Sequence, residues 1–303
     1  MSSAYKMSHT PVLLKEVIEL LEPKEGEVII DGTAGGGGHA KEILKLIGNA
    51  GKLLLVDWDK KAIDNLKKEM KDYKNILLTE GNYADLPEIM RENNFPKADG
   101  LLVDLGFSSG QLENSGRGFS FLKDEPLLMT YSDQSEPLCD FLKRSKLPDL
   151  IEIIRKFGEE RYAKKIAEAI FAKRKEIETS KQLADIIREA VPKSYEHGHR
   201  LGGASRIHPA TRTFQAFRIY LNQELDNLEK ILDSLAEILN PGGRVAVISF
   251  HSLEDRIVKV NFKESEKKGR LKILTEKPII AAAQEVAVNP RARSAKLRAA
   301  MII

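Results

Sequence analysis

Short apolar runs alternate with amphipathic stretches over the first hundred residues of the chain. The stretches place apolar residues at helical spacing, as in Ile43, Leu44 and Ile47, and an earlier stretch, 11–21, does the same after a proline. The apolar runs have the length of buried strands and cover 28–31, 52–57, 75–79 and 100–104. Because parallel neighbours need crossover connections, this alternation predicts an α/β fold with a mostly parallel, doubly wound sheet.

The alternation stops after Asp104. Helical spacing then dominates a long interval, as in 162–173. We therefore expect an inserted all-helical domain at 113–207. The sheet domain is expected to be discontinuous and to consist of 1–112 and 208–303.

The last hundred residues return to the sheet pattern. The stretch 210–239 predicts one long helix, and the turn 240–243 leads into an apolar strand at 244–250. Two further strand-like runs, 271–274 and 297–303, predict an antiparallel hairpin at the edge of the sheet.

Composition narrows the class of protein. With 42% hydrophobic and 31% charged residues among 303, the chain is globular rather than disordered or collagen-like. A single cysteine, Cys139, provides no disulfide framework and favours a reducing compartment, so we expect a cytoplasmic protein. No apolar stretch approaches the ~20 residues that span a bilayer, which predicts no membrane insertion. The net charge of +3 is too small to indicate a polyanionic partner by itself.

A glycine-rich loop follows the first predicted strand. Glycines from Gly35 to Gly38 let backbone N–H groups and the next helix terminus approach a ligand closely, and Gly35-x-Gly37-x-x-Ala40 fits the dinucleotide fingerprint. Asp57 lies 20 positions after Gly37, a spacing suited to ribose hydroxyls. The loop therefore predicts a nucleoside-containing cofactor; the alternative is a glycine turn beside a solvated acid.

Two cofactors remain open at this point. NAD carries a pyrophosphate, whereas S-adenosylmethionine carries a sulfonium and an amino acid tail without phosphate. Asp31, which precedes the loop, would repel pyrophosphate and tolerate the cationic groups, so it favours S-adenosylmethionine. Alternatively, this aspartate only caps a turn.

The loop after the fourth strand runs from Asp104 to Gln111 and carries a carboxylate, two hydroxyls and an amide. A carboxylate is suited to orienting an aromatic amine, whose lone pair is delocalised, and positioning can supply ~7 to 11 kcal/mol of a barrier. The competing interpretation is a turn in which Asp104 bonds to its own loop.

Dense polar stretches also occur at 208–215 and 249–256. Ser252 with Asp255 three positions later indicates a helix capping box. A structural, hydrogen-bonded role is the default for His39 and His208. The separated histidines show no ligand spacing, so no metal site is predicted.

Positive charge gathers in two stretches. Residues 191–220 contain five Lys and Arg with one acid, and 289–303 contain four with none. Nearby aromatic residues suit base stacking beside phosphate contacts on RNA, and the alternative is a solvated face balanced by acids elsewhere. The candidate RNA-binding residues are His208, Arg212, Arg291 and Arg293.

Taken together, the motifs resemble the bacterial 16S ribosomal RNA cytosine-N4 methyltransferase family over almost the whole chain. The matching blocks are Asp31-Gly-Thr-Ala-Gly-Gly-Gly-Gly-His39, Asp104-Leu-Gly-Phe-Ser-Ser109, Arg117-Gly-Phe-Ser120, Gly158-Glu-Glu-Arg161, His208-Pro-Ala-Thr-Arg-Thr-Phe-Gln215 and Ile248-Ser-Phe-His-Ser-Leu-Glu-Asp-Arg-Ile-Val258. The resemblance implies a Rossmann-like S-adenosylmethionine methyltransferase with an inserted helical domain. It also implies that the substrate is a cytidine in the decoding centre of 16S rRNA, in free RNA or in the small ribosomal subunit.

The resemblance also assigns roles to single residues. Cofactor contacts are implied for Gly37, Gly38, His39, Asp57, Tyr83, Asp104 and Gln111. Tyr83 follows the third strand, where an aromatic ring can pack on adenine. The resemblance does not fix the group that accepts the proton. From its carboxylate we expect Asp104 to be the catalytic residue: it orients the amine, and the proton is lost to solvent after methylation.

The chain departs from the family pattern in the segment 126–130. Leu128 and Thr130 stand where the family usually has Asp and Arg, so no substrate contact is assigned to this segment. Two rival functions remain: an NAD-dependent oxidoreductase, and a non-catalytic RNA-binding assembly factor that keeps the fold.

Overall fold

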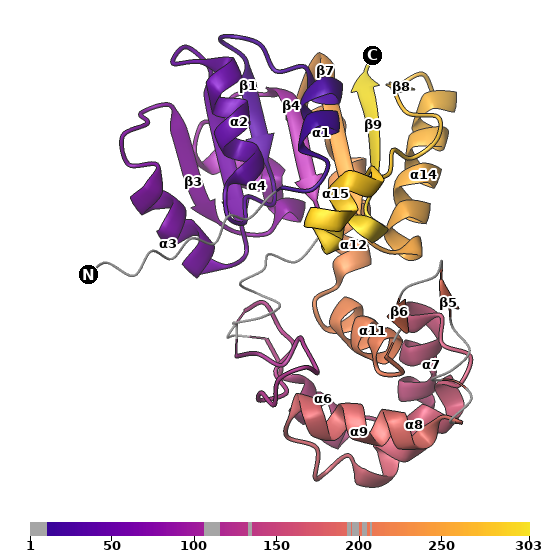
Figure 1. The fold of residues 1–303 in the computed structure, drawn as a ribbon. Helices are drawn as coiled ribbons and strands as arrows, with labels where there is room; N and C mark the ends of the chain where they lie inside the picture. The colour runs from indigo at the N-terminus through magenta and orange to yellow at the C-terminus, as the bar shows by residue number, and fades with distance from the viewer. Residues whose placement is uncertain are drawn as a thin grey trace. The chain divides into compact units, whose positions relative to one another are not determined.

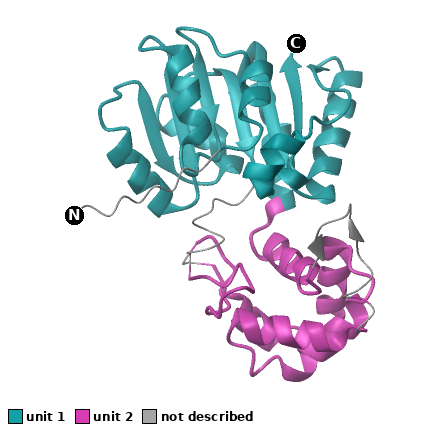
Figure 2. Cartoon of the chain, viewed as in Figure 1, with its two compact units in different colours: residues 1–108, 225–303 teal, residues 109–224 magenta. Residues whose placement is uncertain are grey.

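The computed structural model describes residues 11–105, 116–132, 135–192, 195, 200–201, 205–206 and 208–303. The chain forms two compact units (Figure 2). Unit 1 consists of residues 1–108 and 225–303, and unit 2 of residues 109–224.

A seven-stranded sheet with the order β3-β2-β1-β4-β7-β9-β8 forms the centre of unit 1 (Figure 1). Its strands are β1 (Val28–Asp31), β2 (Lys52–Asp57), β3 (Ile76–Glu80), β4 (Ala98–Asp104), β7 (Leu239–Ser249), β8 (Leu271–Ile273) and β9 (Lys296–Ile302). The strands from β3 to β7 pair in parallel, while β9 pairs antiparallel with both β7 and β8. The predicted mostly parallel sheet with an antiparallel edge hairpin is confirmed.

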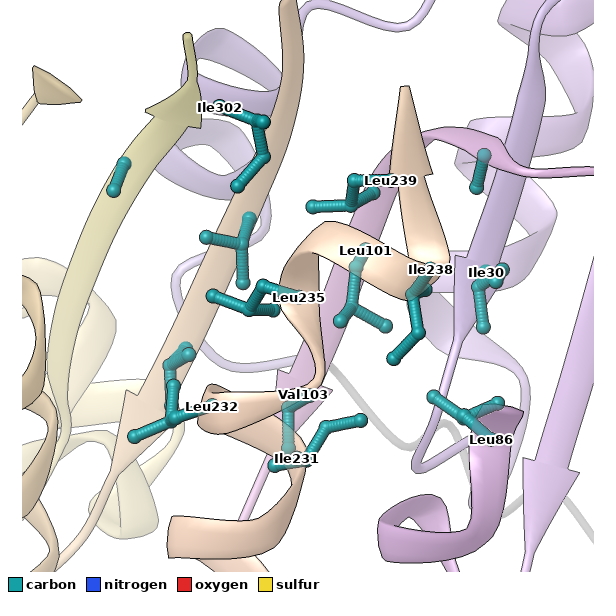
Figure 3. Close-up of a cluster of buried hydrophobic side chains, with 14 of the residues drawn as sticks. Ile30, Leu86, Leu101, Val103, Ile231, Leu232, Leu235, Ile238, Leu239 and Ile302 are labelled. Carbon is teal, nitrogen blue, oxygen red and sulfur yellow. The ribbon is translucent and has the colours of Figure 1, made fainter. Parts of the chain in front are cut away.

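Helices cover both faces of this sheet because successive strand residues point to opposite sides. Ile29 packs with the apolar side of α2, whereas Ile30 belongs to the cluster that α12 and α13 cover on the other face (Figure 3). The helices of unit 1 are α1 (Leu14–Leu21), α2 (Gly38–Ile47), α3 (Lys60–Glu69), α4 (Leu86–Glu92), α12 (Glu224–Asp233), α13 (Leu235–Ile238), α14 (Ser252–Lys267) and α15 (Ala283–Val288), with the short 3-10 turns η1 (Tyr83–Asp85) and η2 (Pro290–Ser294). Burial on both faces explains why the central strands read as unbroken apolar runs.

The predicted single helix over 210–239 is wrong, because the chain forms three shorter helices there. The first, α11 (Thr211–Leu221), ends where Gln223 takes a left-handed conformation with φ of 51°. The Asn222 side-chain amide donates to the Arg218 carbonyl at 2.8 Å, and the Asn222 backbone N–H donates to the same carbonyl at 3.1 Å. α12 and α13 follow, and β7 then begins at Leu239 and includes the expected turn.

Unit 2 is built mainly of helices. They are α6 (Leu138–Arg144), α7 (Leu147–Gly158), α8 (Ala163–Lys173), α9 (Ser180–Ala190) and α11, and two short strands, β5 (Arg200–Leu201) and β6 (Ser205–Arg206), form a separate ribbon. α11 packs on α7 so closely that a Cβ on Gly158 would lie 2.7 Å from the Arg212 carbonyl oxygen. This packing places α11 in unit 2, whose C-terminal limit is therefore residue 224 rather than the expected 207. None of the described helices combines the length and apolar character needed to span a bilayer.

Candidate active site

Three aspartates end neighbouring strands of unit 1 at the same edge of the sheet. β1 lies between β2 and β4, and Asp31 pairs in register with Leu55 on one side and Leu102 on the other. Because these strands are parallel, Asp31, Asp57 and Asp104 all reach the edge formed by the strand carboxyl ends. Ligands of open α/β sheets bind at this edge.

Hydrogen bonds hold the glycine loop after β1 against both neighbouring strands. The Gly32 amide donates to the Leu102 carbonyl at 2.9 Å, and the Ala34 amide donates to the Val56 carbonyl at 2.9 Å. The Asp104 amide donates to the Thr33 hydroxyl oxygen at 2.7 Å, so this side chain links the loop to the end of β4. Thr33 was not among the predicted site residues, although it lies inside the glycine-rich block.

Asp57 anchors the same loop through its carboxylate. Oδ2 accepts from the Gly35 amide at 2.7 Å, and Oδ1 accepts from the Asp59 amide at 2.8 Å. Each carboxylate oxygen can accept a second bond, so Asp57 retains acceptor capacity for ribose hydroxyls. Its side chain is buried, and this burial raises the pKa of Asp57 to about 6.

Asp31 is the most deeply buried acid of the site. It is 1% exposed, and its Oδ1 accepts from the Thr33 amide at 3.1 Å. Burial raises the pKa of Asp31 to about 7, and the charge of Asp57 adds to the shift. Buried carboxylates of this kind are stabilised by a cation, so the donor set fits a nucleoside cofactor that carries positive charge.

The raised pKa values predict how stability depends on pH. Between the unfolded pKa of 3.8 and the folded values of about 7 and about 6, the folded protein binds more protons than the unfolded chain. The free energy of unfolding of the cofactor-free protein should therefore fall as the pH rises from about 5 to about 8. Urea denaturation across this range measures the effect.

Asp31→Asn should raise the free energy of unfolding at pH 8, on the order of 2 kcal/mol, because the buried charge is removed. Asparagine retains the oxygen that accepts from the Thr33 amide. The matched control is Asp72→Asn, at an exposed aspartate. An identical pH slope in the two variants would contradict a buried, titrating Asp31.

The residues at the start of α2 have mainly packing contacts. Gly37 has φ of 72°, and a Cβ there would lie 2.6 Å from Cδ2 of Leu66 in α3. A Cβ on Gly38 would lie 3.1 Å from Pro11. His39 is buried, and its Nε2 lies 3.0 Å from the Val12 carbonyl, as expected for a structural histidine. The predicted cofactor contacts of these three residues depend on their backbone groups.

The structure places Tyr83 beside the glycine loop. It opens η1 after β3, and its Cβ lies 3.1 Å from the position that a Cβ on Gly32 would take. The backbone of Tyr83 therefore lies close to the start of the glycine loop. Gln111, the remaining predicted cofactor residue, lies outside the described residues.

The four predicted RNA-binding residues fall in both units. His208 and Arg212 belong to unit 2: the His208 ring stacks on Phe121 with centroids 4.4 Å apart, and an Arg212 Nη1 donates to the Glu159 carbonyl at 3.0 Å. Arg291 and Arg293 lie in η2 of unit 1. The side chain of Arg293 is exposed.

The segment 126–130, which departs from the family pattern, lies in the interior of unit 2. Leu127, Met129 and Thr130 are buried. Arg117 donates from Nε to the Thr130 carbonyl at 2.6 Å and from Nη2 to the Thr130 hydroxyl at 3.0 Å. The segment therefore holds Arg117 in place.

The predicted capping box at Ser252 and Asp255 is wrong by one residue. His251 is the N-cap of α14, and the box is completed by Glu254, whose carboxylate accepts from the Phe250 amide at 2.8 Å and the His251 amide at 3.3 Å. Asp255 instead accepts from Arg298 Nε at 2.7 Å, which fixes α14 to β9. The buried Glu254 was not predicted from the sequence.

Comparison with known proteins gives a consistent match over the chain. The model of the MraW methylase family matches residues 6–303. Two curated relatives named "Ribosomal RNA small subunit methyltransferase H", from Clostridium botulinum and Halothermothrix orenii, are each 42% identical and cover 97% of this chain and 98% of their own. A relative of the same name from Trichlorobacter lovleyi is 44% identical over 96% of this chain and 97% of its own.

Proposed function

The chain belongs to the MraW methylase family, and from this premise we propose that it methylates the exocyclic N4 of a cytidine in the decoding centre of 16S rRNA. It is an S-adenosylmethionine-dependent methyltransferase of small-subunit ribosomal RNA. The near-full-length identity to relatives of that name is the main support. We place the enzyme in the cytoplasm, where this RNA is found.

The residues at the sheet edge have separate roles in the reaction. The loop from Gly32 to Gly38 and the carboxylate of Asp57 hold the nucleoside part of the cofactor. Asp31 stabilises the positive charge that the cofactor carries. Bound S-adenosylmethionine supplies an electrophilic methyl group on a sulfonium. Asp104 accepts a hydrogen bond from the cytosine amine and directs the nitrogen lone pair at the methyl carbon. The carbon–nitrogen bond would form as the methyl–sulfur bond breaks, which leaves a neutral thioether, and the methylated, cationic nitrogen would then lose a proton to water.

The site can act on a base only after that base leaves its stack. Enzymes that modify bases in structured nucleic acid extrude the target nucleotide into a pocket. The cytosine must therefore reach the end of β4, where Asp104 lies, with the RNA backbone bound on the surrounding surface.

The direct test is methyl transfer from tritiated S-adenosylmethionine to small subunits or 16S rRNA from cells that lack this protein, followed by mass mapping of the modified nucleotide. We expect one methyl group on N4 of one cytidine. Tight NAD binding without methyl transfer would support the oxidoreductase instead, and RNA binding without transfer would support the assembly factor.

Arg291→Ala combined with Arg293→Ala should weaken RNA binding and flatten its dependence on salt. Each lost phosphate contact lowers the slope of log K against log salt by about one, so the pair should lower it by about two. Binding measured between low and moderate salt gives this slope.

The matched control is Arg270→Ala with Lys272→Ala. It removes the same charge near the start of β8, which pairs with the end of β9 farthest from η2. Equal slopes in the two double variants would show that η2 does not contact phosphate.

A further inference from the structure

His251 lies at the sheet edge on the side of β4 away from the cofactor loop. β7 pairs in parallel with β4, Asp104 is in register with Ile248, and the Leu105 amide donates to the Ile248 carbonyl at 3.0 Å. The residues after β7 therefore continue from the sheet in the same direction as those after Asp104. His251 is three positions beyond Ile248.

The strand order separates a cofactor side from an acceptor side. The glycine loop, Asp57 and Tyr83 follow β1, β2 and β3, which lie together on one side of β4. β7 lies on the other side of β4. Asp104 ends the strand between them, so the residues that follow β7 lie on the opposite side of β4 from the cofactor residues.

The hydrogen bonds of His251 fix its tautomer. Nδ1 accepts from the Glu254 amide at 3.4 Å, as the N-cap of α14. An accepting Nδ1 carries no proton, so in the neutral ring the proton is on Nε2. The residue therefore presents one N–H donor beyond its capping role.

That donor is buried and has no hydrogen-bond partner among the residues that the structure describes. The side chain of His251 is 10% exposed, and Nε2 has no hydrogen-bond partner within the described part of the chain. The nearest carboxylate oxygen, Oε1 of Glu254, lies 3.1 Å away but is not aligned with the N–H. The other oxygen of Glu254 accepts from the Phe250 and His251 amides, which holds this carboxylate in place. A buried donor without a partner is costly unless a ligand satisfies it.

We propose that His251 is a substrate-binding residue whose Nε2–H donates a hydrogen bond to a ring acceptor, N3 or O2, of the target cytosine. This inference rests on the proposed function and names a residue that holds its substrate. Asp104 binds the amine, which donates, and His251 binds an acceptor on the same ring, so the two contacts together orient the base. A phosphate stays at the RNA surface, whereas a buried donor is reached by an extruded base.

Three variants separate the capping role from the substrate contact. His251→Asn retains an acceptor at the position of Nδ1 and removes the Nε2 donor. His251→Gln carries an amide N–H near the position of Nε2 and loses the cap. His251→Ala removes both functions.

His251→Asn should keep the wild-type Tm and cofactor affinity, while kcat/KM for rRNA falls about tenfold or more, the effect of one lost hydrogen bond to the substrate. His251→Gln should have a lower Tm but higher activity than His251→Asn. The salt slope of RNA binding should remain wild type in His251→Asn, because no phosphate contact is lost.

Wild-type turnover in His251→Asn would overturn the inference and leave His251 as a helix cap only. A salt slope lowered by one would also overturn it, by assigning the residue to phosphate. Both results are distinct from failure of the proposed function, in which the wild-type enzyme itself transfers no methyl group to cytosine in 16S rRNA.

Discussion

Asp104→Ala should lower the rate of methyl transfer by at least about 100-fold, because the cytosine amine loses the group that aims it at the methyl carbon. The Asp104 backbone amide bonds to the Thr33 hydroxyl, and this contact survives the substitution. The glycine loop should therefore keep its conformation, with cofactor affinity reduced much less than turnover. Single-turnover transfer of a tritiated methyl group, with calorimetric titration of S-adenosylmethionine, measures the two effects.

A second aspartate of the same strand provides the control. Asp99 lies near the start of β4, where its carboxylate accepts from the Val28 amide at 3.0 Å and the Asn240 amide at 2.9 Å. Asp99→Asn should leave transfer close to wild type. If Asp104→Ala retains wild-type turnover, Asp104 has no part in the reaction.

The sheet and the position of the site could be predicted because both depend on short, local patterns. Apolar runs bounded by polar residues located the strands, and alternation with helices made the sheet parallel. Once the strands are parallel, acids at their carboxyl ends must meet at one edge. The placement of Asp31, Asp57 and Asp104 follows from this reasoning.

Features that depend on distant contacts could not be predicted. The bond between Thr33 and Asp104 joins residues 71 positions apart, and no local pattern predicts it. Helical spacing in the sequence continues past Gln223, but the helix ends there. It ends there because the Asn222 side-chain amide also donates to the Met129 carbonyl, 93 positions away. His251 was missed as a cap because serine is the stronger N-cap by propensity.

The second large effect is expected on the affinity for the cofactor rather than on the reaction of the substrate. Asp57→Asn should weaken the affinity for S-adenosylmethionine by ~10- to 100-fold, because hydrogen bonds to a charged acceptor are worth ~1.5 to 3 kcal/mol. The control is Asp59→Asn, which removes the same charge two positions away and retains an N-cap for α3. Calorimetric titration should show little change in this control.

The pH dependence of binding distinguishes a contact to the Asp57 carboxylate from a loss of loop structure. With a pKa of about 6, Asp57 is ionised above neutral pH and becomes protonated as the pH falls through 6. Wild-type affinity should therefore decrease between about pH 7 and pH 5, while Asp57→Asn should lose the part of this decrease that Asp57 contributes and retain the part that Asp31 contributes. The opposite result is that Asp57→Asn loses affinity for S-adenosylmethionine while this affinity depends on pH as in the wild type. In that case the asparagine has disturbed the loop through the Gly35 and Asp59 amides, and the carboxylate does not bind the ribose.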